Sequence, residues 1–260
     1  KKVAIVYALG VCAMDTGLHA RTLVDDIAEA CDEADAVVLR VDSPGGDVLP
    51  SDLVAAAVQK CRGQKPVVVS QGFVAASGGY MISMYGDAIV AAPNTITGSI
   101  GVLLETAEVS GLLERLGVTA ETFRSGPLKG QPTPFAPLND QARAATQSLV
   151  DDIYNWFLAV FAERRGLSLD VARGLADGRA YTGRQALALD LIDAIGGERE
   201  ALQWLADFQG IPGDLPIIDL DREDDQGTFF DLITGLTKKT LFSERLRLDG
   251  PISVWHPAQN

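Results

Sequence analysis

The chain has 260 residues, of which 47% are hydrophobic and 22% are charged, so it can bury a large core and does not have the composition of a disordered protein. With 22 basic and 35 acidic residues, its formal net charge is −13. An acidic protein has few cations with which to displace counterions from phosphates, which excludes nucleic acid as a leading partner. No uncharged apolar run reaches the ~18 residues that span a bilayer, so the chain itself is expected to be soluble.

Cysteine and histidine are too sparse for a metal centre. Cys12, Cys31 and Cys61 form no Cys-x-x-Cys pair, and the two histidines are His19 and His256. We therefore expect neither a metal nor another cofactor. Separated cysteines are most often packed thiols, so no disulfide is expected between Cys31 and Cys61.

The first two-thirds of the chain alternates short apolar runs with helical patterns. Strands are predicted over residues 3–7, 36–41, 66–70, 88–91, 97–102 and 119–124. Helices are predicted over residues 20–31, 51–61, 77–85 and 109–116. Strands that are separated by crossover helices pair in parallel, so the pattern predicts an α/β fold with a parallel-rich sheet.

From residue 139 the pattern becomes helical. A long helix is predicted over residues 139–165, with Asn139 as its cap, Gly166 as its stop, and Trp156, Phe157 and Phe161 on its packing face. Shorter helices are predicted over residues 168–175, 182–192 and 198–209. The organisation predicted up to this point is an α/β core over residues 1–138 and a helical part over residues 139–210.

The remaining residues, 211–260, are expected to form a linker and a helical tail. The stretch 212–226 is acidic and flanked by Pro and Gly, as linkers are. The last predicted helix carries an apolar stripe of Phe229, Leu232, Ile233 and Leu236. Such a stripe packs on the protein or a neighbouring subunit, or else touches a membrane.

Two glycine-rich loops follow predicted strands, which is where sites collect in open α/β sheets. In the loop 42–47, the N–H groups after Gly45 and Gly46 can turn inward and bind a negative oxygen. In the loop 75–80, Ser77 stands at a strand-to-helix turn, followed by the N–H group of Gly78. Taken alone, the first loop is also a common turn, and the second is also a common way to pack a helix start.

A serine nucleophile needs a base, and the sequence offers no histidine between His19 and His256. Lysine is the other candidate, because a lysine removed from water can act as a base. Of the seven lysines, Lys129 differs from the rest in lying in a polar, Gly/Pro-rich loop after a predicted strand. On the residues alone, the better interpretation of Lys129 is a solvated loop lysine.

The motifs taken together resemble the signal peptide peptidase A family of Ser/Lys proteases. They are SPGG at 43–46, ASGGY at 76–80, TGSIG at 97–101, SGxxK at 125–129, PF at 134–135, YTGxxA at 181–186 and LIDxIG at 191–196. The resemblance implies the Clp-protease/crotonase-like fold, with residues 1–210 as the peptidase domain. It also implies the site roles: Ser77 as nucleophile, Lys129 as general base, Ser99 as the hydroxyl that orients the lysine, and Gly46 and Gly78 as oxyanion donors.

The family's substrates are remnant signal peptides and other hydrophobic segments near a membrane, and the resemblance implies an endopeptidase of this kind. We expect an extended peptide to bind as an added strand along Gly45, Asp47 and Val48 on one side and Gly101 and Val102 on the other. The family also implies a homo-oligomer, a ring or dome, attached to the extracytoplasmic (periplasmic) side of a membrane through a segment absent from this chain.

The sequence departs from the family pattern at Leu128, where an aromatic residue commonly precedes the lysine. A double-length branch of the family divides serine and lysine between two halves, whereas this chain holds both, as the single-length branch does. The loop position of Lys129 allows it to reach Ser77 of its own chain or of a neighbour. Two other functions stay open: a non-catalytic scaffold that binds peptides or membrane proteins, and a crotonase-type acyl-CoA enzyme.

Overall fold

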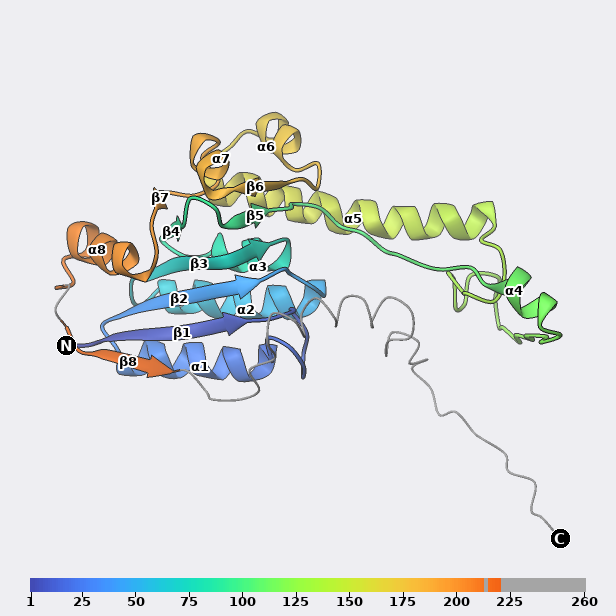
Figure 1. The fold of residues 1–260 in the computed structure, drawn as a ribbon, viewed down its shortest axis with the longest axis horizontal. Helices are drawn as coiled ribbons and strands as arrows, with labels where there is room; N and C mark the ends of the chain where they lie inside the picture. The colour runs from blue at the N-terminus through green and yellow to red at the C-terminus, as the bar shows by residue number, and fades with distance from the viewer. Residues whose placement is uncertain (213–214, 221–260) are drawn as a thin grey trace, which may run out of the picture. The chain divides into compact units, whose positions relative to one another are not determined.

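A mostly parallel sheet brings the two glycine-rich loops to the same end of the molecule (Figure 1). The computed structural model describes residues 1–212 and 215–220, and the sheet within them has the order β6-β5-β3-β2-β1-β8, with β4 also paired to β3 and β7 paired to β4. The strands are β1 (Val3–Leu9), β2 (Ala36–Ser43), β3 (Val67–Ala76), β4 (Ala88–Ala91), β5 (Ile96–Gly98), β6 (Ala180–Thr182), β7 (Ala194–Ile195) and β8 (Ile217–Leu220). Only the β5–β6 pair among them is antiparallel, so the predicted α/β class and parallel-rich sheet are confirmed.

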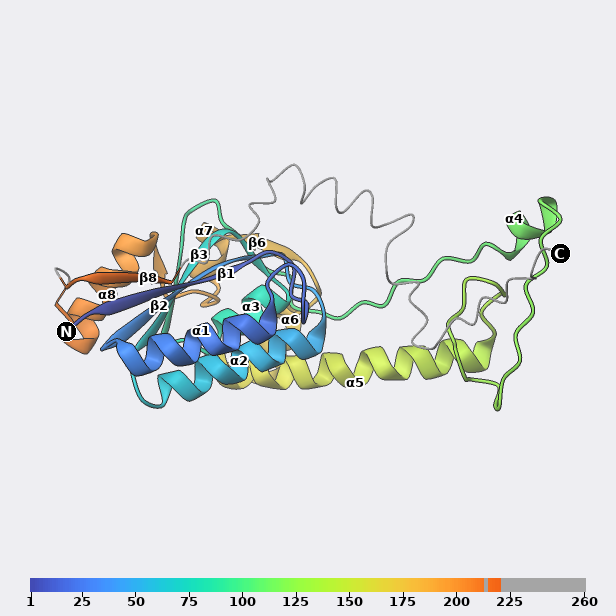
Figure 2. The ribbon, with the colours of Figure 1, turned by 90° about the horizontal axis from the view of Figure 1, so that it is seen from below.

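Helices cover both faces of this sheet (Figures 1 and 2). One face packs against α1 (Ala20–Glu33), α2 (Val48–Arg62), α3 (Gly78–Ser83) and the end of α5 (Asp140–Arg165), and the other against α8 (Glu198–Gln209). Successive side chains of a strand point to opposite faces, so Leu39 and Val41 enter the first core and Val38 enters the second. Coverage on both sides explains why the first half of β2, residues 36–39, is a continuous apolar run.

The long helix α5 begins and ends where the sequence predicts. Asn139 caps it by accepting a hydrogen bond from the N–H group of Ala142 at 2.8 Å, and Gly166 ends it in the left-handed region at φ 64°. Phe157 is buried on its packing face, as Phe161 is, whereas Trp156 stays 37% exposed. Neither α5 nor any other helix of the described residues is long and apolar enough to cross a membrane.

Some predicted elements differ from the structure. Residues 119–124 form no strand and are mostly exposed, because no neighbouring strand lies beside them to pair with. Residues 217–220, inside the predicted linker, form β8 and pair with β1. The remaining helices are short: α4 (Ser110–Arg115), α6 (Leu169–Leu175) and α7 (Gly183–Ala188). The predicted last helix, with Phe229, Leu232, Ile233 and Leu236, lies outside the described residues.

A disulfide joins α1 to α2, which corrects the expectation of unpaired thiols. Cys31 and Cys61 lie with their Cα atoms 5.6 Å apart, and both side chains are buried. The two helices pack side by side on the same face of the sheet, an adjacency that arises only in the folded chain. The third cysteine, Cys12, is a free and buried thiol.

Candidate active site

Ser77 occupies a sharp turn between β3 and α3. Its backbone has φ 53° and ψ −116°, a conformation that residues other than glycine rarely adopt. Two hydrogen bonds hold it there: its N–H group donates to the carbonyl of Gly98 at 2.8 Å, and its carbonyl accepts from Met81 at 2.9 Å. Ser77 is partly exposed while Ala76 and Gly78 are buried. The turn therefore presents the serine at the surface of a rigid, well-packed segment.

An irregularity in β3 sets the position of this turn. The register between β2 and β3 shifts so that Ser43 pairs with Ala75. The carboxylate of Asp42 stabilises the shift by accepting hydrogen bonds from the N–H groups of Phe73 and Val74, each at 3.0 Å. Gly72 leaves room for this carboxylate, since a Cβ atom there would collide with it. The loop after Ser43 thereby lies beside the turn that carries Ser77.

The loop 43–47 packs directly against the turn that carries Ser77. Gly45 has φ 91°, and a Cβ atom on it would lie 2.7 Å from the Cβ atom of Ser77 and 2.7 Å from the nitrogen of Gly78. Gly46 has φ 152°, and a Cβ atom there would collide with the backbone of Cys12. Both positions require glycine, because a side chain at Gly45 would push the loop away from Ser77 and one at Gly46 would push it away from Cys12.

Two N–H groups at this contact are unpaired. Gly45 donates to the hydroxyl of Ser43 at 3.2 Å, and Asp47 donates to the carbonyl of Cys12 at 2.8 Å. The N–H groups of Gly46 and Gly78, in contrast, donate to no other residue that the structure describes. Two unpaired N–H groups beside a serine form the arrangement that binds an oxyanion in acyl transfer.

Ser99 lies one residue beyond the pairing of β5 with β3. The register matches Ala76 with Gly98, so Ser77 and Ser99 are the next residues of the two strands. Ser99 also has a positive φ, 51°, and its hydroxyl donates to the carbonyl of Gly178 at 3.4 Å. The structure thus places this predicted site residue on the segment adjacent to Ser77.

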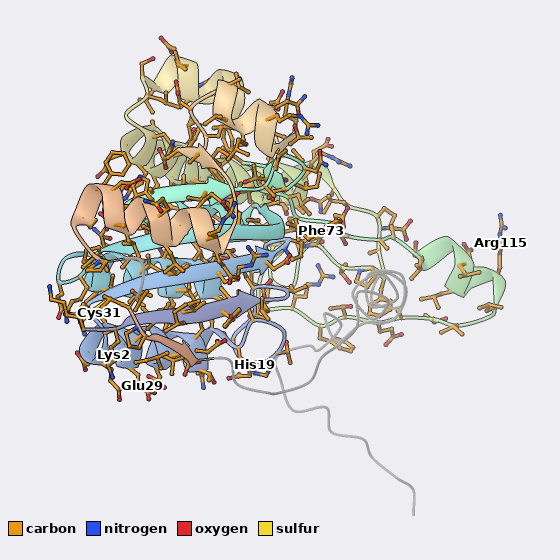
Figure 3. All side chains as sticks on the ribbon, turned by 60° about the vertical axis from the view of Figure 1, so that its left-hand side comes forward. Lys2, His19, Glu29, Cys31, Phe73 and Arg115 are labelled. Atoms are coloured by element: carbon orange, nitrogen blue, oxygen red, sulfur yellow. A yellow bond between two sulfur atoms is a disulfide. The ribbon has the colours of Figure 1, made fainter. Side chains whose placement is uncertain are left out.

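Lys129 lies elsewhere in the chain, in residues 102–139, which we call the arm. The arm leaves the sheet after β5 and returns through α5, and α4 within it lies at the far end of α5, away from α3 (Figures 1 and 2). Figure 3 shows the same separation between Arg115 on α4 and Phe73 on β3. Lys129 is exposed in a turn, its N–H group donating to Gly126 at 3.2 Å. The arm that carries Lys129 thus extends away from α3, which begins next to Ser77 (Figures 1 and 2).

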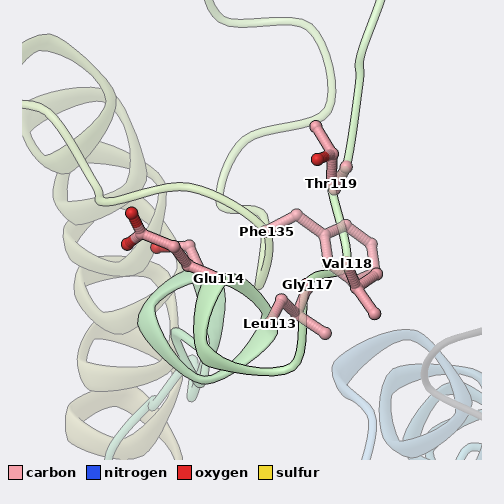
Figure 4. A pocket seen from close by; sticks show the side chains of 8 residues that line it. Leu113, Glu114, Gly117, Val118, Thr119 and Phe135 are labelled. Carbon is pink, nitrogen blue, oxygen red and sulfur yellow. The ribbon is translucent and has the colours of Figure 1, made fainter.

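The arm has no core of its own. No residue from 102 to 140 is buried, and many of its apolar side chains are exposed. They include Leu103, Leu104, Leu112, Leu116, Val118, Phe123, Leu128 and Phe135, of which Phe123 is 92% exposed. A cavity of about 340 Å³ opens among Leu113, Val118 and Phe135 (Figure 4). So many exposed apolar side chains on one segment are characteristic of an interface with another protein chain.

The predicted peptide-binding residues only partly present a free backbone edge. Gly101 and Val102 are partly exposed and belong to no strand or helix, as an added strand requires. Asp47 is the cap of α2 and Val48 its first residue. Binding of an extended peptide along Asp47 and Val48 stays a prediction, and in the structure Val48 already belongs to the first turn of α2. The open part of this loop ends at Asp47.

Sequence reasoning missed three residues beneath the loop: Cys12, Ser43 and Ser51, all fully buried. Burial raises the pKa of the Cys12 thiol, although hydrogen bonds with Ser43 and Ser51 act in the opposite direction. Cys12 therefore stays a neutral thiol and is not a competing nucleophile. No motif marks Cys12 or Ser51, and Cys12 meets the loop because the residues after β1 continue in parallel beside the residues after β2.

Comparison with known proteins gives a consistent result. A model of peptidase family S49 matches residues 59–211. The chain is 34% identical over 235 residues to the Synechocystis sp. protein named "Putative protease slr0021", covering 90% of this chain and 83% of that one. It is 39% identical over 170 residues to an Enterococcus faecium protein named "Putative signal peptide peptidase SppA", covering 65% of this chain and 49% of that one.

A plant relative and a solved structure extend the comparison. The protein named "Serine protease SPPA, chloroplastic" of Arabidopsis thaliana is 32% identical over 214 residues, which cover 81% of this chain and 31% of the plant protein. The structure of a ClpP1 mutant from Listeria monocytogenes superposes with a TM-score of 0.52 at 14% identity, covering 76% of this chain and 93% of that one. The fold of this chain is thus the Clp-protease fold that the motifs predict.

Proposed function

This chain belongs to peptidase family S49, which confirms the resemblance to signal peptide peptidase A, and we propose that it is a serine endopeptidase with a Ser/Lys dyad. Ser77 is the nucleophile and Lys129 the general base. The observation that carries the proposal is the Ser77 turn, because it joins an exposed serine in a strained backbone to two unpaired N–H groups. Such strain is retained where the geometry serves a function.

The reaction follows from these positions. The Oγ atom of Ser77 attacks the scissile carbonyl while its proton passes to the neutral amine of Lys129. The N–H groups of Gly46 and Gly78 bind the negative oxygen of the tetrahedral intermediate. The lysine then returns the proton to the leaving amine, which leaves an acyl group on Ser77. Water, activated by the same lysine, releases the acyl group and restores the serine.

We further propose that the base comes from a neighbouring subunit. Within one chain Lys129 is exposed on the arm, whereas a lysine that acts as a general base has to be removed from water. Docking the apolar arm onto a second copy would cover side chains such as Phe123 and would remove Lys129 from water at the same time. The protein is accordingly a homo-oligomer whose active sites form between chains, with Ser99 orienting the incoming amine.

The substrate class and location follow the family. Hydrophobic peptides, including remnants of signal peptides, suit the exposed apolar side chains near the strand ends, such as Leu49 and Phe73. The disulfide between Cys31 and Cys61 supports the extracytoplasmic side of a membrane, because disulfides persist in oxidising compartments.

A fluorogenic peptide rich in Leu and Ala tests the dyad. Wild type should cleave it, and Ser77→Ala and Lys129→Ala should each lose at least about 10³-fold in kcat. Lys60→Ala is the matched control, because Lys60 is an exposed lysine on α2. Full activity in Ser77→Ala or Lys129→Ala would contradict the mechanism.

Mixing the two inactive variants tests the shared site. Ser77→Ala and Lys129→Ala subunits, dissociated and reassembled in equal amounts, should regain about one quarter of the wild-type sites, because each intact pair needs one intact residue from each neighbour. If Ser77 and Lys129 of the same chain formed the dyad, the mixture of variants would show no activity.

A further inference from the structure

The backbone of Cys12 forms hydrogen bonds with residues on both sides of Gly46 in the loop 43–47, which we call the glycine loop. Its N–H group donates to the carbonyl of Gly45 at 2.8 Å, and its carbonyl accepts from the N–H group of Asp47 at 2.8 Å. These two bonds form a parallel bridge between Cys12 and Gly46. In a parallel bridge the enclosed residue directs its own N–H group away from the partner strand. The backbone of Cys12 therefore turns the N–H group of Gly46 outward, where it remains unpaired.

The side chain of Cys12 reaches the same loop by a second route. Its Sγ atom lies 3.4 Å from the hydroxyl of Ser43, which accepts a hydrogen bond from Gly45. Ser51 packs against Gly78 together with the same sulfur, and its hydroxyl donates to the carbonyl of Asp47 at 2.8 Å. The buried side chains of Cys12, Ser43 and Ser51 thus form one cluster. This cluster contacts Gly45 and Asp47, the residues on either side of Gly46.

This cluster also supports the second N–H group. A Cβ atom on Gly78 would lie 3.3 Å from the sulfur of Cys12 and would collide with the hydroxyl of Ser51. Gly78 therefore packs directly on the two side chains. One buried cluster fixes both unpaired N–H groups, those of Gly46 and Gly78, relative to each other.

Resting on the proposed function, we infer that Cys12 is a positioning residue for the oxyanion site: through Ser43, Ser51 and its own backbone it holds the N–H groups of Gly46 and Gly78 at the spacing the intermediate requires. It touches no reacting atom. Small displacements of a preorganised donor reduce transition-state stabilisation more than substrate binding. Loss of the thiol should therefore lower kcat and leave KM nearly unchanged.

The first test compares Cys12→Ala, Cys12→Ser and Ser70→Ala in the peptide assay. Cys12→Ala keeps the backbone bonds and should lose about tenfold in kcat, less than the ~10²–10³ lost with a whole donor. Cys12→Ser, which keeps a hydrogen-bonding group, should recover most of that loss. Ser70→Ala is the matched control, because it removes an equally buried hydroxyl, bonded to Arg40. Wild-type kcat in Cys12→Ala, or no recovery in Cys12→Ser, would overturn the inference.

A second measurement does not depend on activity. Hydrogen–deuterium exchange by mass spectrometry follows the backbone amides of residues 45–47 in the assembled protein. Cys12→Ala should exchange there at least several-fold faster than wild type, while Ser77→Ala should match wild type. Unchanged exchange in Cys12→Ala would overturn the positioning role. Failure of the proposed function would instead appear as full peptide cleavage by Ser77→Ala, with the exchange result unaffected.

Discussion

Replacing Gly45 by alanine tests how tightly the glycine loop fits the serine turn. At φ 91° an added Cβ atom is strained, and it would lie 2.7 Å from the Ser77 Cβ atom, 2.7 Å from the Gly78 nitrogen and 2.9 Å from the Ala76 carbonyl oxygen. Two of these three neighbours are backbone atoms, so the conflict cannot be relieved by rotating a side chain. The loop must move away from Ser77.

The expected effects can be separated into stability and rate. A strained backbone costs about 1–3 kcal/mol, which lowers the midpoint of thermal unfolding by about 2–12 °C for a chain of this size. Displacing the Gly46 donor costs about 3–4 kcal/mol of transition-state stabilisation, or ~10²–10³ in kcat. The loss in rate should thus exceed what the loss of folded protein explains.

The assay is peptide cleavage per folded subunit, with thermal unfolding measured on the same samples. Gly174→Ala is the matched control, because Gly174 lies in α6 and an added Cβ atom meets no atom within 4 Å. It should leave kcat unchanged and stabilise the chain by about 0.4–1 kcal/mol. A folded Gly45→Ala protein with wild-type kcat would refute the proposed contact between the loop and the serine.

Two further changes test the scaffold. Asp42→Ala removes both hydrogen bonds that hold the irregularity of β3 and should cost about 2–4 kcal/mol of unfolding free energy in urea; a loss under about 1 kcal/mol would show that other contacts hold it. The double variant Cys31→Ala/Cys61→Ala removes the disulfide between residues that lie 30 positions apart. It should lower the free energy of unfolding by about 2–4 kcal/mol while kcat per folded subunit stays unchanged. An unchanged free energy of unfolding in the double variant would contradict this.

The sequence predicts the two turns of the site because their backbone conformations are local, whereas the roles of their residues come from the resemblance to the family. Pro-Gly-Gly after a buried strand and a serine among small residues before a helix both depend on backbone conformations that neighbouring residues determine. The same holds for the caps of α5, where Asn139 and Gly166 act within one turn of the helix. These predictions required no knowledge of tertiary contacts.

The features that the sequence could not predict depend on distant segments. Residues 119–124 have the composition of a strand, yet a strand forms only where a partner is available. The pairing of Cys31 with Cys61 requires two helices to pack side by side. Cys12 meets the glycine loop only because β1 and β2 are neighbours in the folded sheet and the residues that follow them continue side by side. The position of Lys129 relative to Ser77 depends, on our proposal, on a second chain.

The most direct test of the dyad is to trap the acyl group on the assembled protein. A hydrophobic activated ester, N-acetyl-leucine p-nitrophenyl ester, is added and quenched within the first turnovers, and the modified residue is located by peptide mass spectrometry. The account predicts one acyl group per chain on Ser77, none in Ser77→Ala, and slower formation in Lys129→Ala than in Lys60→Ala. An acyl group on another residue, or equal rates in the two lysine variants, would contradict it.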